Sequence, residues 1–357
     1  NVSFIEGVTL STSSMHARYD NALSSTFQFD QRNGNPDKFQ GNFRLSSTEA
    51  ALTTEGPIGK KVTYIASVRR SYLEFLFKAI DLPIRPNYWD FQYKVNYKLN
   101  NKTSFNFIGL GSLDDFKFAV PRESTPESEY VIRSSPNINQ WSYTQGFSVK
   151  HKIENGFINA SLSRNMLNNA LDKFADNNEG NEDFRTLKSQ SQEIENKFRV
   201  EVNKYSNNWK FSYGMMSQYV KYNNNFYNKV RDEITDPQTG IVIAPAIEVN
   251  FDTEIDFVKL GAFGQVSRRF MEERLSLSLG LRTDMNSFTD KGLNPLNTLS
   301  YRLGASYQIN NKFTVNASTG SYYKIPIYTV LGFRDENGTL VNKSNKYIQS
   351  FHYVAGL

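Results

Sequence analysis

The sequence contains no cysteine among its 357 residues. A disulfide framework, a thiol nucleophile and a thiolate metal site are therefore all excluded. Histidine is scarce as well, since His16, His151 and His352 are the only three and lie far apart, without the spacing of metal ligands. His151 falls on the apolar side of a predicted strand beside a turn, where an interfacial position is expected. We therefore expect no metal centre.

Long hydrophobic runs are also missing. No stretch of about 18 apolar residues occurs, which excludes a membrane crossing by α-helices. Hydrophobic residues nevertheless make up 39% of the chain and aromatic residues 14%, with 27 Phe and 20 Tyr. A transmembrane β-barrel remains compatible with this composition, because only every second strand residue faces lipid and aromatic side chains gather at both membrane interfaces.

The charge is only mildly basic. The 41 Lys and Arg residues exceed the 36 Asp and Glu residues by five, and no segment concentrates the excess. This pattern gives no indication of a nucleic-acid partner. It is compatible with contacts to anionic lipid headgroups and to the phosphates of lipopolysaccharide.

Alternation of apolar and polar residues is the main feature that is present. Leu275, Leu277, Leu279 and Leu281 are separated by serine and glycine and followed by Arg282, and the segment 299–310 repeats the pattern. A period of two places each set on one face of a β-strand. The sequence therefore predicts strands with one apolar and one polar face.

About fourteen such segments follow one another from residue 39 to the end. Tight Asn, Lys and Gly turns alternate with long polar loops, so the short turns are all expected at one end of the strands. The segments are about nine to eleven residues long, which suits a tilted strand that crosses a bilayer. Soluble sandwiches, propellers and solenoids are disfavoured by this length, by the lack of a fixed repeat and by aromatic residues near strand ends. We predict an all-β, antiparallel, up-and-down transmembrane barrel.

The first 35 residues differ from this pattern, and Asn33-Gly34-Asn35-Pro36 gives a strong turn and linker signal. The chain begins without a signal peptide at Asn1 and stops inside an apparent strand at Leu357. We expect it to be an interior piece of a longer protein.

The segment from Ala17 to Phe29, with Arg18-Tyr19-Asp20-Asn21-Ala22 inside it, resembles the end of the plug of a TonB-dependent receptor. It departs from the family pattern at Asp20, where glycine is usual, and at Ser25-Thr26, where Gly-Val is common. Further stretches are similar to receptors of the Bacteroidetes type. These are Glu55-Gly56-Pro57-Ile58, Ala66-Ser67-Val68-Arg69-Arg70-Ser71-Tyr72, Trp89-Asp90-Phe91-Gln92-Tyr93-Lys94-Val95, Ser163-Arg164-Asn165-Met166, Gly280-Leu281-Arg282-Thr283-Asp284-Met285-Asn286 and Tyr328-Thr329-Val330-Leu331-Gly332-Phe333.

The resemblance implies a barrel of about 22 strands filled by an N-terminal plug. Residues 1–36 would be the end of the plug and a linker, and residues 37–357 about fourteen barrel strands, incomplete at the C-terminus. It also implies an integral protein of the bacterial outer membrane that takes up a scarce nutrient. The substrate would be a metal chelate, an oligosaccharide or a peptide, and TonB would supply energy by pulling on an N-terminal region that this chain lacks.

Polar residues opposite the apolar stripes are the candidate pore-lining or plug-contacting groups. They are Gln40, Asn42, Arg44, Arg69, Lys94, Asn96, Arg282, Asp284 and Arg302. Most of them are expected to hold the plug or to face water.

Residues 75–87 form an unusually apolar predicted loop, with Phe75, Phe77, Ile80 and Ile84 as its main side chains. The loop either folds over the plug, with a short helix near 74–80, or offers a docking face to a surface lipoprotein or another outer-membrane subunit. The acidic segment 176–183 carries oxygen ligands but lacks the twelve-residue calcium-loop spacing, so a solvated extracellular loop is expected.

Catalysis finds no support in the sequence. No nucleophile elbow or acid pair stands out, and Gly109-Leu110-Gly111 precedes no helix, so it is no phosphate loop. We expect neither an enzyme nor a cofactor. Two alternatives to energised transport stay open. One is a structural barrel subunit of a larger outer-membrane complex. The other is a complete fourteen-strand passive channel, in which the segments 39–45 and 347–357 would pair.

Overall fold

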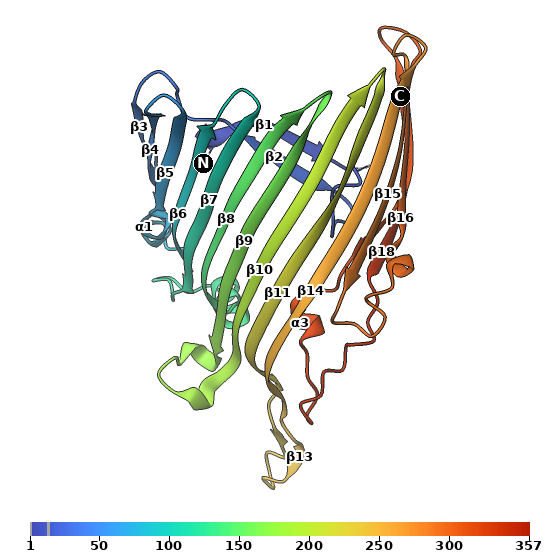
Figure 1. The fold of residues 1–357 in the computed structure, drawn as a ribbon. Helices are drawn as coiled ribbons and strands as arrows, with labels where there is room; N and C mark the ends of the chain where they lie inside the picture. The colour runs from blue at the N-terminus through green and yellow to red at the C-terminus, as the bar shows by residue number, and fades with distance from the viewer. Residues whose placement is uncertain (1, 13–14) are drawn as a thin grey trace.

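The computed structural model describes residues 2–12 and 15–357. Asn1, Ser13 and Ser14, which belong to the expected plug end, lie outside the described residues. A single antiparallel sheet of fourteen strands dominates the molecule and curves around an open interior (Figure 1). This confirms the predicted fold class and the predicted number of strands.

The strands follow one another in the sheet in chain order, as an up-and-down meander requires, and only the small hairpin β12–β13 interrupts the series. They are β3 (Gln40–Leu45), β4 (Glu49–Ile58), β5 (Val62–Ser71), β6 (Ile84–Lys98), β7 (Thr103–Phe118), β8 (Asn137–Ile153), β9 (Gly156–Phe174), β10 (Arg185–Ser206), β11 (Trp209–Arg231), β14 (Ile247–Phe270), β15 (Leu275–Asn286), β16 (Ser300–Gln308), β17 (Thr314–Lys324) and β18 (Ile348–Gly356), with β12 (Ile234–Thr235) and β13 (Val242–Ala244) between β11 and β14.

The sheet is open, with β3 and β18 at its two edges. No pairing joins these two strands among the residues that the structure describes. The pairing that would have favoured a complete fourteen-strand channel is therefore not found.

Several strands are longer than the nine to eleven residues that the sequence predicted. β10, β11 and β14 contain 22, 23 and 24 residues. Their outward side chains explain the extra length. On β14, Val258 and Leu260 are exposed on the outward face, but Asp252, Glu254 and Asp256 occupy the outward positions further along. Charged groups avoid hydrocarbon, so the strand continues past the apolar band toward water.

Short turns gather at one end of the sheet and long loops at the other (Figure 1). One prediction was wrong here, because the short connection 46–48 between β3 and β4 lies at the long-loop end. The tight turns use residues that tolerate a left-handed backbone or form side-chain turns. Asn155 has a φ of 52°, and the side chain of Asn100 accepts hydrogen bonds from the backbone N–H groups of Lys102 and Thr103.

Short helices occupy some of the long loops: α1 (Leu73–Ala79), α2 (Pro126–Ser134) and α3 (Tyr328–Leu331), with 3₁₀ turns η2 (Ala175–Asn177), η3 (Glu182–Phe184) and η4 (Pro295–Thr298). The helix expected near 74–80 is confirmed as α1, whereas α2 and α3 were not predicted. No helix within the described part of the chain has both the length and the apolar character to cross a membrane.

The two faces of the sheet differ as the alternation predicted. Leu277, Leu279 and Leu303 are each more than 40% exposed on the outward face, whereas Arg282 and Arg302 are buried on the inward face. A cluster of apolar side chains packs inside the sheet, where the β17–β18 loop and α3 lie against inward residues of β11 and β14. The buried members of this cluster are Val220, Tyr222, Ile255, Phe257, Ile325, Tyr328 and Leu331.

The N-terminal segment lies against the concave face of the sheet. It consists of a 3₁₀ turn η1 (Val2–Phe4) and the hairpin of β1 (Ile5–Ser11) and β2 (Thr26–Gln31), seen behind the large sheet in Figure 1. Between the two strands, residues 15–25 form a compact segment, called the inner loop below. Its contacts with the large sheet make up the candidate site.

Candidate functional site

The inner loop is folded tightly by its own backbone. The N–H of Tyr19 donates to the carbonyl of His16 (3.0 Å), and the N–H of Arg18 donates to Nδ1 of the same histidine (3.1 Å). Met15 and Ala17 are buried against the sheet. The ring of His16 meets Phe263 edge-on, and burial together with the charge of Arg18 lowers the pKa of His16 to about 4. The imidazole is therefore held neutral at physiological pH.

Two arginines of the sheet hold this turn by its carbonyl groups. Arg302 on β16 donates to the carbonyls of Met15 (3.2 Å), His16 and Tyr19 (3.0 Å). Arg282 on β15 donates to the carbonyl of Ala17 (3.2 Å). A guanidinium group carries five N–H donors in a fixed plane, which suits it to bind several acceptors of one turn.

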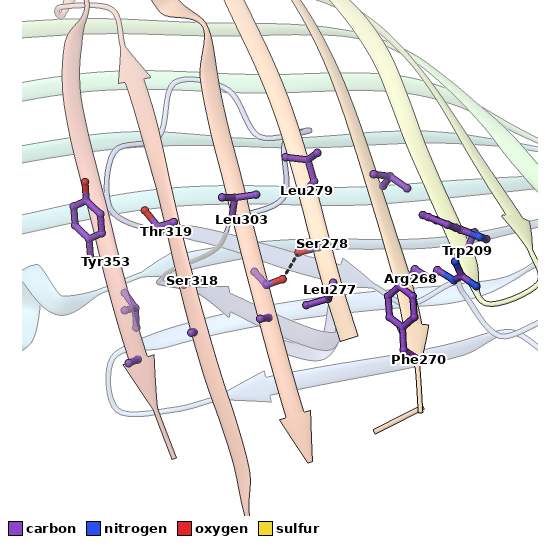
Figure 2. Close-up of a pocket in the computed structure, with 16 residues that line it drawn as sticks. Trp209, Arg268, Phe270, Leu277, Ser278, Leu279, Leu303, Ser318, Thr319 and Tyr353 are labelled. Atoms are coloured by element: carbon purple, nitrogen blue, oxygen red, sulfur yellow. Dashed lines mark hydrogen bonds between the residues drawn. The ribbon is translucent and has the colours of Figure 1, made fainter. Parts of the chain in front are cut away.

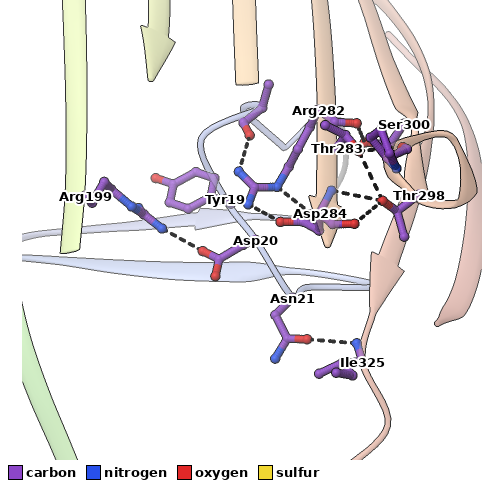
Figure 3. Close-up of polar contacts among 12 residues, drawn as sticks. Tyr19, Asp20, Asn21, Arg199, Arg282, Thr283, Asp284, Thr298, Ser300 and Ile325 are labelled. Atoms are coloured by element: carbon purple, nitrogen blue, oxygen red, sulfur yellow. Dashed lines mark hydrogen bonds and ion pairs between the residues drawn. The ribbon is translucent and has the colours of Figure 1, made fainter. Parts of the chain in front are cut away.

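Asp284 orients Arg282. The Nε of Arg282 donates to Oδ2 of Asp284 (2.8 Å), and the backbone N–H of Asp284 donates to Oγ1 of Thr298 (2.9 Å). Figure 3 shows this chain of contacts ending at the inner loop. Arg282 is buried, so the carboxylate supplies the partner that a buried cation needs.

Asp20 is the charged centre of the inner loop. Its carboxylate binds Nζ of Lys197 (3.0 Å) and Nη2 of Arg199 (2.6 Å), both on β10. Burial raises the pKa of Asp20, but the charges of Lys197 and Arg199 outweigh burial and hold this pKa well below its usual range. The carboxylate is thus ionised and paired on the wall of the sheet (Figure 3).

The inner loop also reaches the cluster at the long-loop end. Oδ1 of Asn21 accepts a hydrogen bond from the backbone N–H of Ile325 (3.1 Å), at the start of the β17–β18 loop. From there α3 follows, where the hydroxyl of Tyr328 donates to Glu195 on β10. The backbone of Asn21 is left-handed, with a φ of 56°. Asparagine tolerates this conformation, which lets its side chain reach the loop.

A second set of contacts lies where the N-terminal hairpin joins the sheet. Lys94 on β6 donates to the carbonyl of Gln31. Arg32 binds Glu55 on β4 through two hydrogen bonds of 2.6 and 2.8 Å, and the backbone N–H of Asn35 donates to the same carboxylate (2.9 Å). The bidentate geometry fixes the direction in which the chain enters β3.

The six charged residues among the candidate pore-lining or plug-contacting groups fall into two sets. Lys94, Arg282 and Arg302 contact the N-terminal segment, with Asp284 bound to Arg282 as described. Arg44 and Arg69 lie elsewhere on the inward face and form ion pairs along the wall, with Glu49 for Arg44 and with Glu49 (2.9 Å) and Asp90 (2.6 Å) for Arg69.

Sequence reasoning missed other residues at this site, above all Asp20, Lys197, Arg199 and Gln265. Oε1 of Gln265 accepts a hydrogen bond from the backbone N–H of Ala17 (2.8 Å). The signal that could have found Asp20 is its departure from the usual glycine of the family pattern. A carboxylate at a position that normally has no side chain needs a cationic partner nearby.

The apolar loop is shorter than predicted. Ile84 does not belong to it, because it lies in β6 opposite Phe118. Residues 84–88 of β6 pair with β7 alone, so Pro86 in this stretch costs no hydrogen bond to β5. Phe75 and Ile80 remain at α1, 67% and 58% exposed. Phe77 lies in the same helix, which contacts β6 and has no buried residue.

The acidic loop is structured by its neighbours. Glu182 binds Arg185 (2.7 Å), and Arg185 also binds Asp172. Within the described part of the chain, no three His, Asp or Glu side chains gather in a way that could hold a metal ion.

Comparisons with known proteins match this geometry to one family. Residues 18–350 match the family described as "TonB dependent receptor-like, beta-barrel". No curated protein matches the chain.

Solved structures with the same fold include a mutant of the ferric enterobactin receptor PfeA from Pseudomonas aeruginosa, at 13% identity and a TM-score of 0.64, covering 92% of this chain and 50% of that one. The copper transporter OprC matches at 15% identity and a TM-score of 0.65, covering 97% of this chain and 55% of that one. The siderophore receptor PirA from Acinetobacter baumannii matches at 13% identity and a TM-score of 0.59, covering 90% and 48%.

The chain spans about half the length of these structures. Their similarity at such low identity concerns the fold. The family match extends over nearly all of the sequence, including the inner loop from Arg18 onward and the sheet up to β18. This chain belongs to the TonB-dependent receptor β-barrel family, whose members are outer-membrane proteins.

Proposed function

We propose that the chain is part of an integral outer-membrane receptor of a bacterium that takes up a scarce nutrient with energy from TonB. Residues 1–36 are then the end of the plug and its linker, and residues 37–357 are barrel. The proposed role is non-enzymatic, and the substrate class is a metal chelate, an oligosaccharide or a peptide. The outward apolar band supports a proposed surrounding of outer-membrane lipids and lipopolysaccharide, and the Bacteroidetes type stays a prediction.

The observation that carries the proposal is the kind of bond that holds the inner loop. Its contacts with the wall are mostly hydrogen bonds from Arg282 and Arg302 and the ion pairs of Asp20. Each hydrogen bond of this type contributes only about 0.5–3 kcal/mol net, because water replaces the lost partner. An interface of this kind can be opened and remade in a watery lumen. A dry apolar interface of the same size resists such a cycle.

The strands of the wall behave differently. The long pairings such as β11 with β14 join 22 residue pairs along their length. A force applied to the N-terminal segment therefore meets a few separable polar contacts before it meets a continuous ladder. The inner loop is the element expected to move, and the sheet is the element expected to stay.

The path from the long-loop end to the plug is short. The β17–β18 loop packs on the inward face of β11 and β14, and its first residue, Ile325, is hydrogen-bonded to Asn21. A substrate that displaces this loop changes a direct contact of the inner loop. Capture at the long-loop end is in this way connected to release of the plug.

A covalent staple tests whether the inner loop must move. A Cβ atom placed on Gly280 would lie 3.1 Å from Cβ of Ala17, slightly closer than in a usual disulfide. The double variant Ala17→Cys with Gly280→Cys is made in the full-length receptor, and each single variant serves as a control. Small molecules that copurify with the receptor from detergent are identified first by mass spectrometry and supply the transport substrate.

The expected result is that the oxidised double variant binds this substrate but does not transport it, and that reductant restores uptake. The single variants transport in both states. Uptake by the fully oxidised double variant at the rate of the unmodified receptor would refute a mobile plug, and with it energised transport through this part of the molecule.

A structural role in a larger complex is the second candidate, favoured by the exposed apolar side chains of α1. Phe75 and Ile80 present a small apolar face at the long-loop end. A surface lipoprotein is the proposed partner of this face, alongside TonB at the region that precedes this chain. Purification of the full-length receptor with Phe75→Ser and Ile80→Ser decides the matter. Loss of a stoichiometric protein partner supports docking at α1, and an unchanged complex contradicts it.

A further inference from the structure

An apolar hollow opens on the outward face near the short-turn end of β14 to β18. Its volume is about 760 Å³, and Figure 2 shows its lining. Three alanines form its floor, because Ala305, Ala317 and Ala355 lie directly opposite one another on β16, β17 and β18. Larger side chains border it in the neighbouring row, with Leu279, Leu303, Thr319 and Tyr353 in register. The hollow thus results from small residues set beside a ridge of large ones.

A cation without a partner lies at the edge of this hollow. The guanidinium of Arg268 lies between two aromatic rings, 4.7 Å from the centre of Trp209 and 4.6 Å from that of Phe270. Its Nε is buried and has no hydrogen-bond partner, and no carboxylate pairs with Arg268 among the described residues. Stacking between two rings stabilises the charge but satisfies none of its in-plane N–H groups.

The neighbouring arginines differ in this respect. Arg269 binds Glu273 (2.9 Å), and Arg274 donates to the carbonyls of Gln308 (3.1 Å) and Ile309 (2.6 Å). Both are therefore satisfied by the protein itself. Arg268 alone among these three has neither a carboxylate nor a carbonyl partner in the part of the chain that the structure describes. Because its Nε is buried, its terminal N–H groups are the donors left for an acceptor from outside.

The position of Arg268 indicates what that acceptor is. β14 ends at Phe270, so Arg268 lies close to the turn, where Trp209 and Phe270 mark the membrane surface. A cation at this level, with an apolar hollow beside it toward the membrane interior, matches a molecule with an anionic head and a hydrocarbon tail. A phosphate oxygen accepts well from a guanidinium group.

We propose that this surface binds one phospholipid of the periplasmic leaflet, with its phosphate on Arg268 and an acyl chain over Ala305, Ala317 and Ala355. The assignment rests on the outer-membrane placement proposed above. It does not depend on the substrate, on TonB or on movement of the plug.

The test measures lipid retention by the full-length receptor. The protein is delipidated in detergent, titrated with palmitoyl-oleoyl phosphatidylglycerol and examined by native mass spectrometry. Arg268→Gln removes the cation, and Ala317→Leu fills the hollow. The matched controls are Arg70→Gln, an arginine that lies over the ring of Trp89 at the other end of the strands, and Ala160→Leu, on the outward face of β9.

We expect one tightly held lipid in the unmodified receptor and in both controls. In Arg268→Gln and in Ala317→Leu its dissociation constant should rise by about tenfold or more, the effect of losing one charge-assisted hydrogen bond or the room for a chain. A phosphatidylglycerol with a photoreactive acyl end should label β16 or β17 in the unmodified protein.

Equal retention in all five proteins would overturn the proposal, and so would labelling spread evenly over the outward face. Cross-linking of the hollow to a polypeptide in membranes would assign it to a protein partner and would overturn it as well. These measurements need neither the transport substrate nor energy from TonB. Their outcome can therefore be interpreted even if the transport experiment fails.

Discussion

The ion pairs of Asp20 should determine how firmly the inner loop is bound to the wall. In Asp20→Asn the side chain keeps its size but loses its charge, which leaves Lys197 and Arg199 without their shared carboxylate. Removing one partner of a fully buried pair costs roughly 3–5 kcal/mol. Here the side chains of Lys197 and Arg199 are 28% and 22% exposed, so water compensates part of the loss. We expect a cost of about 2 kcal/mol.

This cost should appear as local opening of the inner loop. Two backbone amides report on it, since the N–H of Ala17 donates to Gln265 and the N–H of Tyr19 to the carbonyl of His16. A loss of about 2 kcal/mol lowers their hydrogen-exchange protection about thirtyfold. Exchange is measured by mass spectrometry on the full-length receptor in detergent, with amides of β15 as an internal reference.

Asp115→Asn is the matched control, because that carboxylate pairs with Lys117 at 3.3 Å on an exposed part of β7. It should leave the protection of the inner loop unchanged. A change of less than about threefold in the protection of Ala17 and Tyr19 in Asp20→Asn would refute this role of the ion pairs. A parallel loss in β15 would also refute it, since the effect would then be global.

Three further outcomes follow from the same structure. The pKa of His16 falls to about 4 on folding, so the inner loop should be bound most firmly above pH 6.5. As the pH falls from 6.5 to 4, its binding should weaken by up to about 1.4 kcal/mol per pH unit. Hydrogen exchange of the inner loop in His16→Gln should lack this pH dependence. Leu279→Arg on the outward face should lower the free energy of unfolding in vesicles by about 2–4 kcal/mol, whereas Gln308→Arg on the inward face should change it by about 0.5 kcal/mol or less. A Cβ on Gly109 would lie 2.2 Å from the ring of Tyr93, so Gly109→Val should lower the free energy of unfolding by about 1–3 kcal/mol in denaturant titrations. The same substitution should cost clearly less in a protein that also carries Tyr93→Ala. An equal cost in both backgrounds would contradict the steric overlap.

The strands and their two faces could be predicted because alternation is local. Whether Leu277 and Leu279 share a face depends only on their spacing, and the structure shows both exposed on the outward side. The ends of the strands were harder to place. Glu254 and Asp256 break the apolar pattern on β14, although the ladder continues, because the outward face has by then left the apolar band.

The site was less accessible to sequence reasoning. Arg282 and Arg302 could be selected because they stand opposite apolar stripes, but their acceptors in the inner loop are more than 260 residues away in the sequence. Asp20 was seen only as an exception to a family pattern. Its partners Lys197 and Arg199 become visible when the meander brings β10 beside the inner loop. Such pairs depend on tertiary structure, which a periodicity of two does not specify.

The proposed function requires a sheet with one face in contact with hydrocarbon and the other in contact with a polar interior. Spin labels placed one at a time on residues 275–282 of the full-length receptor in phospholipid vesicles test this directly. The present sequence has no cysteine, and any cysteine elsewhere in the receptor is replaced first. The accessibility of the labels to oxygen should peak at residues 277, 279 and 281. Their accessibility to a water-soluble nickel chelate should peak at none of these three positions. Equal accessibility at odd and even positions, or chelate access at 277 and 279, would contradict the account.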